Sequence, residues 1–247
     1  MSTIDRLLDH LKADAPVQQV LVGAFWTAVV LDTDPPRGGL ASTLRAEDHD
    51  SGPPIAEAGR LDRRSGRELA EWLRSPRILK ASVGMAALNA LLEVDPDAHP
   101  EINAAEVILE RGAGRRVAIV GHFPFVERVR RAAEVCWVVE KRPRPGDVAA
   151  DRAAEVLPQA DVVALTGTSL LNHTYDDLVR LCRPDAFVLV LGPSTPLSPL
   201  LLQDGVDGVS GTWVVDPQRV LRSIAQGATF RQIKRTGGLR LLTMMAM

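Results

Sequence analysis

The sequence predicts an α/β protein in which a small α+β unit precedes a Rossmann-like, mostly parallel sheet. In the second half of the chain, short apolar runs alternate with helical segments, as in parallel strands that are covered on both faces. The first half lacks this alternation, because a β-rich stretch is followed by two helices. The stretch "DPDAHPE" separates the two patterns. We therefore expect a domain boundary near residue 98, between units 1–98 and 99–247.

The first unit begins with "MSTIDRLLDHLKADAP", which carries charges throughout and predicts an amphipathic helix. The stretch "VQQVLVGAFWTAVVLDT" is β-rich with a bend expected at Gly23, and "DPPRGG" predicts a turn before the next strand, "GGLASTLR". Residues 46–60 are rich in Gly, Pro and acidic residues, and we expect a loop there. A helix is expected in "SGRELAEWLRS", where Ser65 and Glu68 have the spacing of a capping box.

A second helix is predicted over "PRILKASVGMAALNALLEV", with Pro76 in its first turn. Its many Ala and Gly residues should let another backbone approach closely. We expect part of this helix to reach the edge of a ligand cleft, where the amide of Asn89 would be hydrogen-bonded. The alternative is that the helix packs only on the strands of its own unit.

The second unit begins with the helix "NAAEVILERG". Strands are expected at "RVAIVG", "VCWVVEK", "DVVALTG", "FVLVLG", "GVSGTWV" and "LRLLTMM". Helices are expected between them at "PFVERVRRAAE", just before Leu157, and at "TYDDLVRLC", "PLSPLLLQ" and "PQRVLRSIAQG". Strands that alternate with helices in this way form parallel sheets through right-handed crossovers.

Composition restricts the classes of function. The chain has 247 residues, 46% of them hydrophobic, and a formal net charge of -2, so no overall positive field recruits nucleic acid or an anionic membrane. The longest apolar run, "VLVGAFWTAVVL", is 12 residues long, which is too short to cross a bilayer. Two separated cysteines and a charged beginning without a leader pattern favour a cytoplasmic protein. Whether it forms a homo-oligomer is left open.

The ends of the predicted strands locate a candidate site. In open α/β sheets, ligands bind beyond the carboxyl ends of the strands, where helix N-termini also point. Glycines and hydroxyl residues follow several of these strands, which suits an anionic or oxygen-rich small ligand. The candidate ligand-binding residues are Gly121, His122, Phe123, Pro124, Glu140, Thr166, Gly167, Thr168, Asn172, Gly192, Pro193, Ser194 and Thr195, together with Asn89 from the first unit.

Several of these residues also have a purely structural interpretation. Pro124 suits the first turn of a helix, Thr174 with Asp177 has capping-box spacing, and Thr195 before Pro196 suits an N-cap. In the turn after the first strand, Phe123 and Phe125 form either a wall of the pocket or part of the core.

Glu140 ends the second strand of the sheet, 19 residues after Gly121. An acidic residue near that spacing often receives ribose hydroxyls. The alternative is an ion pair with Lys141 or Arg142. Because His122, Phe123 and Pro124 stand where a dinucleotide site has further glycines, a NAD-type diphosphate site is not expected. A nucleoside-like or S-adenosylmethionine-like ligand remains open.

The sequence offers little support for a protein-built metal site or a serine hydrolase. It contains no C-x-x-C pair, no H-E-x-x-H and no G-x-S-x-G. His122 and His173 both follow predicted strands, and either one could face the site. Catalytic and metal-binding residues are therefore left unassigned.

The motifs "SVGMAALNAL", "VGHFPF", "LPQADVVALTGTSLLNHT", "VLGPSTPLSP" and "GVSGTWVVDP", in this order, resemble one family. It is a bacterial and archaeal family of uncharacterised proteins labelled as "putative heavy-metal chelation" proteins. The resemblance covers nearly the whole chain and is densest over residues 117–216. It implies an N-terminal domain similar to that of enolases, a Rossmann-like C-terminal domain, and a site where the two meet.

Two main hypotheses of function follow. The first is a protein that binds a small molecule or a metal complex between the domains, with a heavy-metal ion or metal chelate as the ligand that the resemblance implies. The second is a transferase or lyase acting on a nucleoside-like or carboxylate substrate, with S-adenosylmethionine as a candidate cofactor and Glu140 on a ribose or acting as a base. A purely structural or partner-binding protein is the remaining class, and it predicts no pocket at the strand ends.

Overall fold

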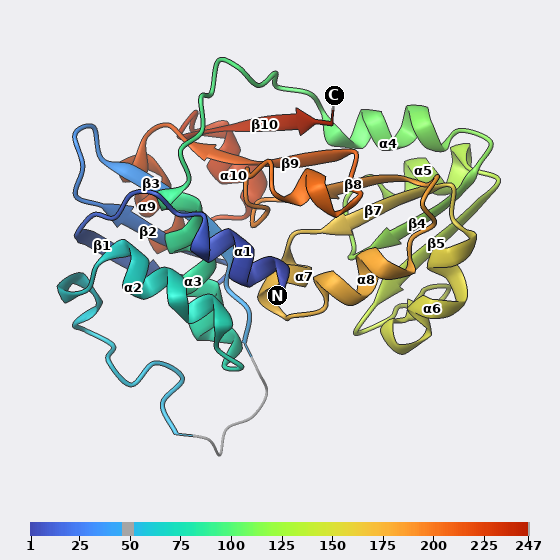
Figure 1. The fold of residues 1–247 in the computed structure, drawn as a ribbon. Helices are drawn as coiled ribbons and strands as arrows, with labels where there is room; N and C mark the ends of the chain where they lie inside the picture. The colour runs from blue at the N-terminus through green and yellow to red at the C-terminus, as the bar shows by residue number, and fades with distance from the viewer. Residues whose placement is uncertain (46–51, 247) are drawn as a thin grey trace.

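The computed structural model describes residues 1–45 and 52–246 and contains two sheets. A three-stranded antiparallel sheet has the order β1-β2-β3, and a seven-stranded sheet has the order β10-β9-β8-β7-β4-β5-β6. Figure 1 shows the small sheet and its helices on one side of the large sheet. The predicted fold class, a small α+β unit followed by a mostly parallel α/β sheet, is confirmed.

The N-terminal elements follow the predicted order. They are α1 (Thr3–Asp9), β1 (Val17–Val22), β2 (Trp26–Leu31), β3 (Arg37–Ser42), the 3-10 turn η1 (Leu61–Arg63), α2 (Gly66–Ala70), the 3-10 turn η2 (Glu71–Arg74) and α3 (Ile78–Leu91). The predicted capping box of Ser65 and Glu68 is present, but the helix changes to 3-10 geometry at Glu71. Pro76 precedes the N-cap residue Arg77 and so lies just outside α3. Residues 46–51 of the predicted loop lie outside the described residues.

The small residues of α3 allow two close backbone approaches. A Cβ atom added to Gly84 would lie 2.2 Å from the backbone nitrogen of Leu73. A Cβ atom on Gly39 of β3 would lie 2.0 Å from the carbonyl oxygen of Ala86 in α3. Real Cβ atoms do not come this close to other atoms, so both contacts require glycine. The predicted close approach of another backbone to this helix is therefore confirmed.

The second unit alternates strands and helices as predicted. Its elements are α4 (Ala104–Gly112), β4 (Arg116–Val120), α5 (Val126–Ala132), β5 (Val135–Glu140), β6 (Val148–Ala149), η3 (Ala150–Arg152), α6 (Ala153–Val156), η4 (Leu157–Gln159), β7 (Val162–Thr166), α7 (Thr168–Leu171), α8 (Tyr175–Leu181), β8 (Phe187–Leu191), η5 (Leu201–Asp204), β9 (Gly208–Val214), α9 (Pro217–Ala225), α10 (Phe230–Arg235) and β10 (Leu239–Met245). The strands from β4 to β9 pair in parallel, and β10 is antiparallel to β9.

Four local predictions in the second unit were wrong. The helix after β4 begins at Val126, so Pro124 lies in the turn before it. The segment "PLSPLLLQ" forms only the 3-10 turn η5, because Pro196 and Pro199 lack the N–H groups of a continuous helix, and Thr195 caps nothing. Thr174 precedes α8, but its hydroxyl donates to Oδ1 of Asn172, 2.6 Å away, instead of capping the helix.

The large sheet is covered on both faces. One face packs on α4 and α5 through apolar residues such as Ile108 and Val129. The other face shares a single core with α7, α8 and the N-terminal unit. In this core, Leu7 of α1 and Leu88 of α3 belong to the same apolar cluster as Val163 of β7. The N-terminal unit therefore packs directly on the large sheet. Across the described residues, every helix is too short or too polar to cross a membrane.

Candidate functional site

The strand order creates a crevice beside β4. Strands β5 and β6 lie on one side of β4, and the chain then returns to place β7, β8 and β9 on its other side. Counted from β4, the parallel strands therefore lie in the order 3-2-1-4-5-6. In such sheets, the connections that leave neighbouring strands in opposite directions open a crevice at the carboxyl edge, and ligands bind there.

A cavity of about 450 Å³ lies at this point, within the usual range for small-molecule sites. It is lined by residues that follow β4, β5 and β7 and by residues of η3, α6 and α8. The lining residues are Val120, Gly121, His122, Val139, Glu140, Lys141, Ala150, Asp151, Ala153, Ala154, Thr166, Thr168, Ser169, Asn172, Thr174, Asp177, Leu178 and Leu181.

Six of the residues singled out in the sequence meet in this cavity. They are Gly121, His122, Glu140, Thr166, Thr168 and Asn172. The other eight, which are Phe123, Pro124, Gly167, Gly192, Pro193, Ser194, Thr195 and Asn89, are not among its lining residues. Their assignment to a ligand remains a prediction, and several of them have structural contacts.

Gly121 makes the turn that opens the cavity. Its φ angle is +102°, which an L side chain rarely adopts, and an added Cβ would lie 3.0 Å from Cβ of Thr166. Phe123 and Phe125 then stack on each other, with ring centroids 5.1 Å apart, and both pack on the apolar cluster beneath α4 and α5. The turn is therefore filled by aromatic rings on the face opposite α8.

The hydroxyl groups in the cavity are held by local hydrogen bonds. The hydroxyls of Thr166 and Thr168 lie 2.9 Å apart, and the hydroxyl of Ser169 donates to the carbonyl of Thr166 at 2.7 Å. Oδ1 of Asn172 accepts from the hydroxyl of Thr174. These contacts order the side chains around the end of β7, so the hydroxyl-rich edge is preorganised.

Two polar groups in the cavity wall have unused hydrogen-bonding capacity. Nδ1 of His122 is buried and has no hydrogen-bond partner among the described residues. One oxygen of Glu140 accepts the backbone N–H of Lys141 at 3.2 Å, and within residues 1–45 and 52–246 its carboxylate forms no ion pair. The alternative, an ion pair of Glu140 with Lys141 or Arg142, is therefore not found among the described residues.

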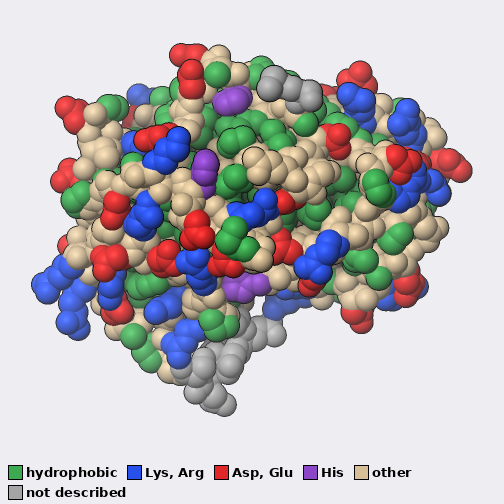
Figure 2. All heavy atoms as spheres, in the orientation of Figure 1, with side chains coloured by type: hydrophobic (Ala, Val, Ile, Leu, Met, Phe, Trp, Pro, Cys, Tyr) green, Lys and Arg blue, Asp and Glu red, His purple; other side chains and the backbone are tan. Residues whose placement is uncertain are grey.

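The cavity lining is negatively charged. Carboxylates of Glu140, Asp151 and Asp177 line it, together with the ammonium group of Lys141, and the Asp177 carboxylate forms an ion pair with Arg180 at 3.1 Å. Acidic and basic side chains are interspersed on the face of the molecule shown in Figure 2, so the field in the cavity depends mainly on these nearby groups. Such a lining favours a neutral or cationic ligand, whereas the sequence alone suggested an anionic or oxygen-rich one.

Asn89 and Ser194 cover the edge of β3 that does not pair with β2. The backbone N–H of Thr43 donates to the carbonyl of Phe25, and pairing alternates along an antiparallel ladder. The carbonyl of Leu40 and the N–H of Ser42 therefore point away from β2. Nδ2 of Asn89 donates to the Leu40 carbonyl at 2.9 Å, and the Ser194 hydroxyl accepts the Ser42 N–H at 2.8 Å.

Asn89 also reaches across to the large sheet, because its Nδ2 lies 3.4 Å from the carbonyl oxygen of Ser194. The predicted approach of α3 to the turn after β8 is therefore present. In this structure the approach is a packed contact between the two units, and Asn89 does not line the cavity. Thr195 is buried beside this contact, and its hydroxyl has no hydrogen-bond partner among the described residues.

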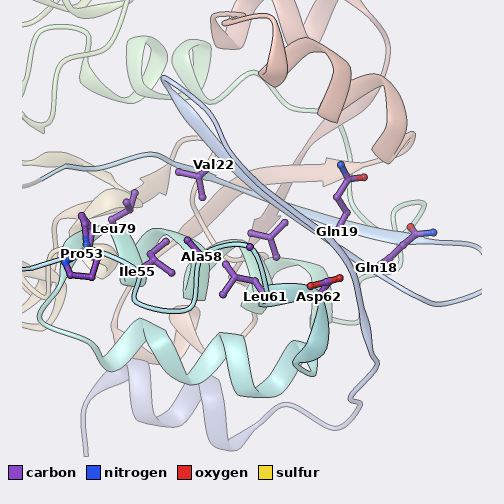
Figure 3. Close-up of a pocket in the computed structure, with 12 residues that line it drawn as sticks. Gln18, Gln19, Val22, Pro53, Ile55, Ala58, Leu61, Asp62 and Leu79 are labelled. Atoms are coloured by element: carbon purple, nitrogen blue, oxygen red, sulfur yellow. The ribbon is translucent and has the colours of Figure 1, made fainter.

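A second hollow, of about 710 Å³, lies in the N-terminal unit between β1 and residues 53–62 (Figure 3). Its walls are mainly apolar, and its polar side chains, Gln18, Gln19 and Asp62, gather at one end. No pattern in the sequence indicated this hollow. It offers few groups that could orient a polar ligand, so the cavity at the sheet edge is the candidate site.

The side chains present do not fit a bare heavy-metal ion. Among the described residues, no three His, Cys, Asp or Glu side chains are grouped as a metal site would need. Burial raises the pKa of the Cys136 thiol and that of the Cys182 thiol, each to about 11. Neither thiol is among the residues that line the cavity, so no thiol is available there to a soft metal ion.

Sequence reasoning missed the side walls of the cavity. Asp151, Ala153 and Ala154 come from η3 and α6, and Leu178 and Leu181 come from α8. No motif marks these residues, because they reach the cavity only when α6 and α8 fold over the strand ends. The one signal in the sequence was that α6 and α8 lie in crossovers between strands of the large sheet, and such helices can cover the strand ends.

Comparisons with known proteins agree with this architecture. Two family descriptions match the chain, over residues 103–243 and 4–92, and both read "Putative heavy-metal chelation". An uncharacterized protein of Methanocaldococcus jannaschii is 26% identical over 194 residues, which cover 74% of this chain and 72% of the relative.

Two crystal structures of proteins of unknown function from the family that matches residues 103–243 are similar in fold. The protein from Desulfitobacterium hafniense has a TM-score of 0.80 and 23% identity, covering 98% of this chain and 97% of its own. The protein from Pyrococcus horikoshii has a TM-score of 0.82 and 19% identity, covering 98% of both chains. At these identities the likeness establishes the fold alone.

Proposed function

The chain belongs to the family described as "Putative heavy-metal chelation", and on that premise we propose that it binds a small organic ligand in the cavity beside β4. A metal would enter this cavity as a complex with an organic ligand. The observation that carries the proposal is the meeting of Gly121, Glu140 and Thr166, from three strand ends, in one cavity at the crevice of the sheet.

Chelation by an organic ligand reconciles the family description with the side chains present. The cavity has hydroxyl, amide and carboxylate groups, which suit the outer surface of a chelate better than a naked soft ion. Because Arg180 pairs with Asp177, the carboxylates of Glu140 and Asp151 face the single ammonium group of Lys141, so the complex should be neutral or positively charged. Complexes of histidine with Ni²⁺ or Co²⁺ have this character.

A second candidate is a transferase or lyase that acts on a nucleoside-like or carboxylate substrate. Glu140 favours it, because its carboxylate lies at the end of β5 without an ion pair in the described part of the chain. His122 would supply a buried imidazole nitrogen beside the same cavity. A base and a hydrogen-bonding group near one ligand are the parts that proton transfer requires.

Isothermal titration calorimetry tests the proposal. Ni²⁺ and Co²⁺ would be titrated alone, and then as their histidine complexes. We expect at least one complex to bind with a Kd below about 1 mM, and more tightly than its free ion. If neither the complexes nor any nucleoside or carboxylate probe binds, the cavity is not a ligand site and the proposal fails.

A blocked cavity provides the matched comparison. Ala154 is exposed and lines the cavity, so Ala154→Trp should fill it and weaken binding at least tenfold while the fold is retained. Ala132 is exposed in α5, which covers the opposite face of the sheet, so Ala132→Trp should leave binding unchanged. Equal losses in both variants would contradict this location of the site.

A further inference from the structure

The cavity contains two distinct environments. Its polar part lies at the ends of β4, β5 and β7, where Glu140, Thr166 and Thr168 are found. Its apolar part lies between α6 and α8, where Ala153 and Ala154 line the cavity together with Leu178 and Leu181. The small alanine side chains leave room for a flat group, and the leucines offer an apolar surface to its faces. This arrangement suits an aromatic ring that is attached to a polar group.

We infer that this cavity takes a ribonucleoside, or a compound built on one, that carries no diphosphate. This inference rests on the proposed function, because it names the class of organic ligand that the cavity accepts. The ribose hydroxyls would bind the Glu140 carboxylate, and the base would lie between α6 and α8.

Glu140 is placed for a vicinal diol. It ends the strand next to β4, and in nucleotide-binding sheets a carboxylate at this position accepts the ribose hydroxyls. A carboxylate has two oxygens and about four acceptor positions. Only the backbone N–H of Lys141 uses one of them among the described residues. The remaining capacity is sufficient for two hydroxyl donors.

The turn after β4 argues against a diphosphate. A dinucleotide site would continue with further glycines after Gly121. Here Phe123 follows two residues later and packs with Phe125 on the apolar cluster beneath α4 and α5. The carboxylates of Glu140 and Asp151 also repel phosphate groups, whereas that of Asp177 is paired with Arg180. The ligand is therefore uncharged or positively charged at the end that faces β4 and β7, as in a free nucleoside or S-adenosylmethionine.

His122 is placed for the substituent beyond the ribose. Its buried Nδ1 has no partner among the described residues, and it follows Gly121 at the end of β4. A hydroxyl, amine or carboxyl group of the ligand would satisfy this atom. The hydroxyls of Thr166 and Thr168 lie at the end of the neighbouring strand β7 and offer further hydrogen bonds.

Calorimetry with defined nucleosides tests the inference. The probes are adenosine, guanosine, cytidine, uridine and S-adenosylmethionine, together with the 2′,3′-dideoxy form and the 5′-diphosphate of each nucleoside. We expect at least one of the five to bind with a Kd below about 1 mM. If the probe that binds is S-adenosylmethionine, Glu140→Gln is its test and should weaken its binding about tenfold or more. If it is a nucleoside, its dideoxy form should bind at least about tenfold more weakly, as the loss of hydrogen bonds to a charged group implies. The diphosphate should also bind more weakly.

The variant Glu140→Gln identifies the group that recognises the diol. It should weaken binding of the ribonucleoside about tenfold or more and leave the dideoxy form unchanged. Asp151→Asn removes another carboxylate from the same lining and should affect both forms equally or not at all. Circular dichroism and thermal unfolding show whether each variant is folded.

The outcomes separate this inference from the proposed function. Binding of a metal complex without binding of any nucleoside overturns the nucleoside inference and leaves the proposed function intact. Binding of none of the probes overturns both. A nucleoside that binds equally well in its dideoxy form, or to Glu140→Gln, overturns the assignment of Glu140 to the ribose.

Discussion

Replacing Asn89 with alanine should destabilise the protein without altering the cavity. Nδ2 of Asn89 is the partner of the Leu40 carbonyl on the edge of β3, and Leu40 is fully buried. Removing the amide leaves this carbonyl without a partner, which costs about 1–3 kcal/mol. The weaker contact with the Ser194 carbonyl at 3.4 Å is lost as well. Oδ1 of Asn89 is buried without a hydrogen-bond partner among the described residues, so its removal offsets part of this loss, and we expect the free energy of unfolding to fall by about 1 kcal/mol in total.

Urea denaturation followed by circular dichroism measures this change, and the melting temperature should fall by about 2–4 °C. Asn172→Ala is the matched comparison, because Asn172 lines the cavity. It should weaken ligand binding and cost less stability than Asn89→Ala. The reasoning would be refuted if Asn89→Ala unfolded at the wild-type urea concentration and yet lost the ligand, since Asn89 would then contact the ligand.

Three further predictions concern the scaffold. Gly39→Ala should lower the free energy of unfolding by at least about 2 kcal/mol in urea denaturation, because the added Cβ would lie 2.0 Å from a carbonyl oxygen of α3. Hydrogen bonds from Arg116 hold the pKa of Asp161 well below its ordinary value. The ionised Asp161 carboxylate should therefore contribute its full stabilisation above about pH 5 and lose it as the pH falls toward the lowered pKa of the folded state. The difference in unfolding free energy between wild type and Asp161→Asn, measured by denaturation, should therefore disappear in acid. Burial raises the pKa of Cys136 and Cys182 to about 11, so iodoacetamide should label both slowly at pH 7.5 and quickly in urea; fast labelling of the folded protein would contradict this.

The sequence predicted the strands and their ends well because this information is local. A buried parallel strand is a short apolar run, and the turn that follows it often requires a glycine with positive φ. Gly121 and Gly192 both stand at such positions, with φ angles of +102° and +120°. Once the strands are known, their carboxyl ends must lie on one edge of the sheet, so residues as distant as Glu140 and Thr166 could be assigned to one site.

The roles of Asn89 and Ser194 could not be predicted in the same way. Both are polar residues next to small ones, which is also the pattern of a ligand site. Their partners, the Leu40 carbonyl and the Ser42 N–H, became available only because β3 is an edge strand of a three-stranded sheet. Strand order is a tertiary property, and an unpaired strand edge that must be covered cannot be recognised from the residues that cover it.

The one-turn helix α7 connects the cavity with the core that the two units share. Thr168 and Ser169 of α7 line the cavity, while the next two residues, Leu170 and Leu171, belong to the core that also contains α1 and α3. The N-terminal unit thus packs against the helix that carries part of the cavity wall, although the lining residues all lie between Val120 and Leu181. A change in the packing of α3 would reach the cavity through a shift of this one-turn helix. If the proposed ligand binds in this cavity, the N-terminal unit would influence its binding through the position of Thr168, without any of its own side chains contacting the ligand.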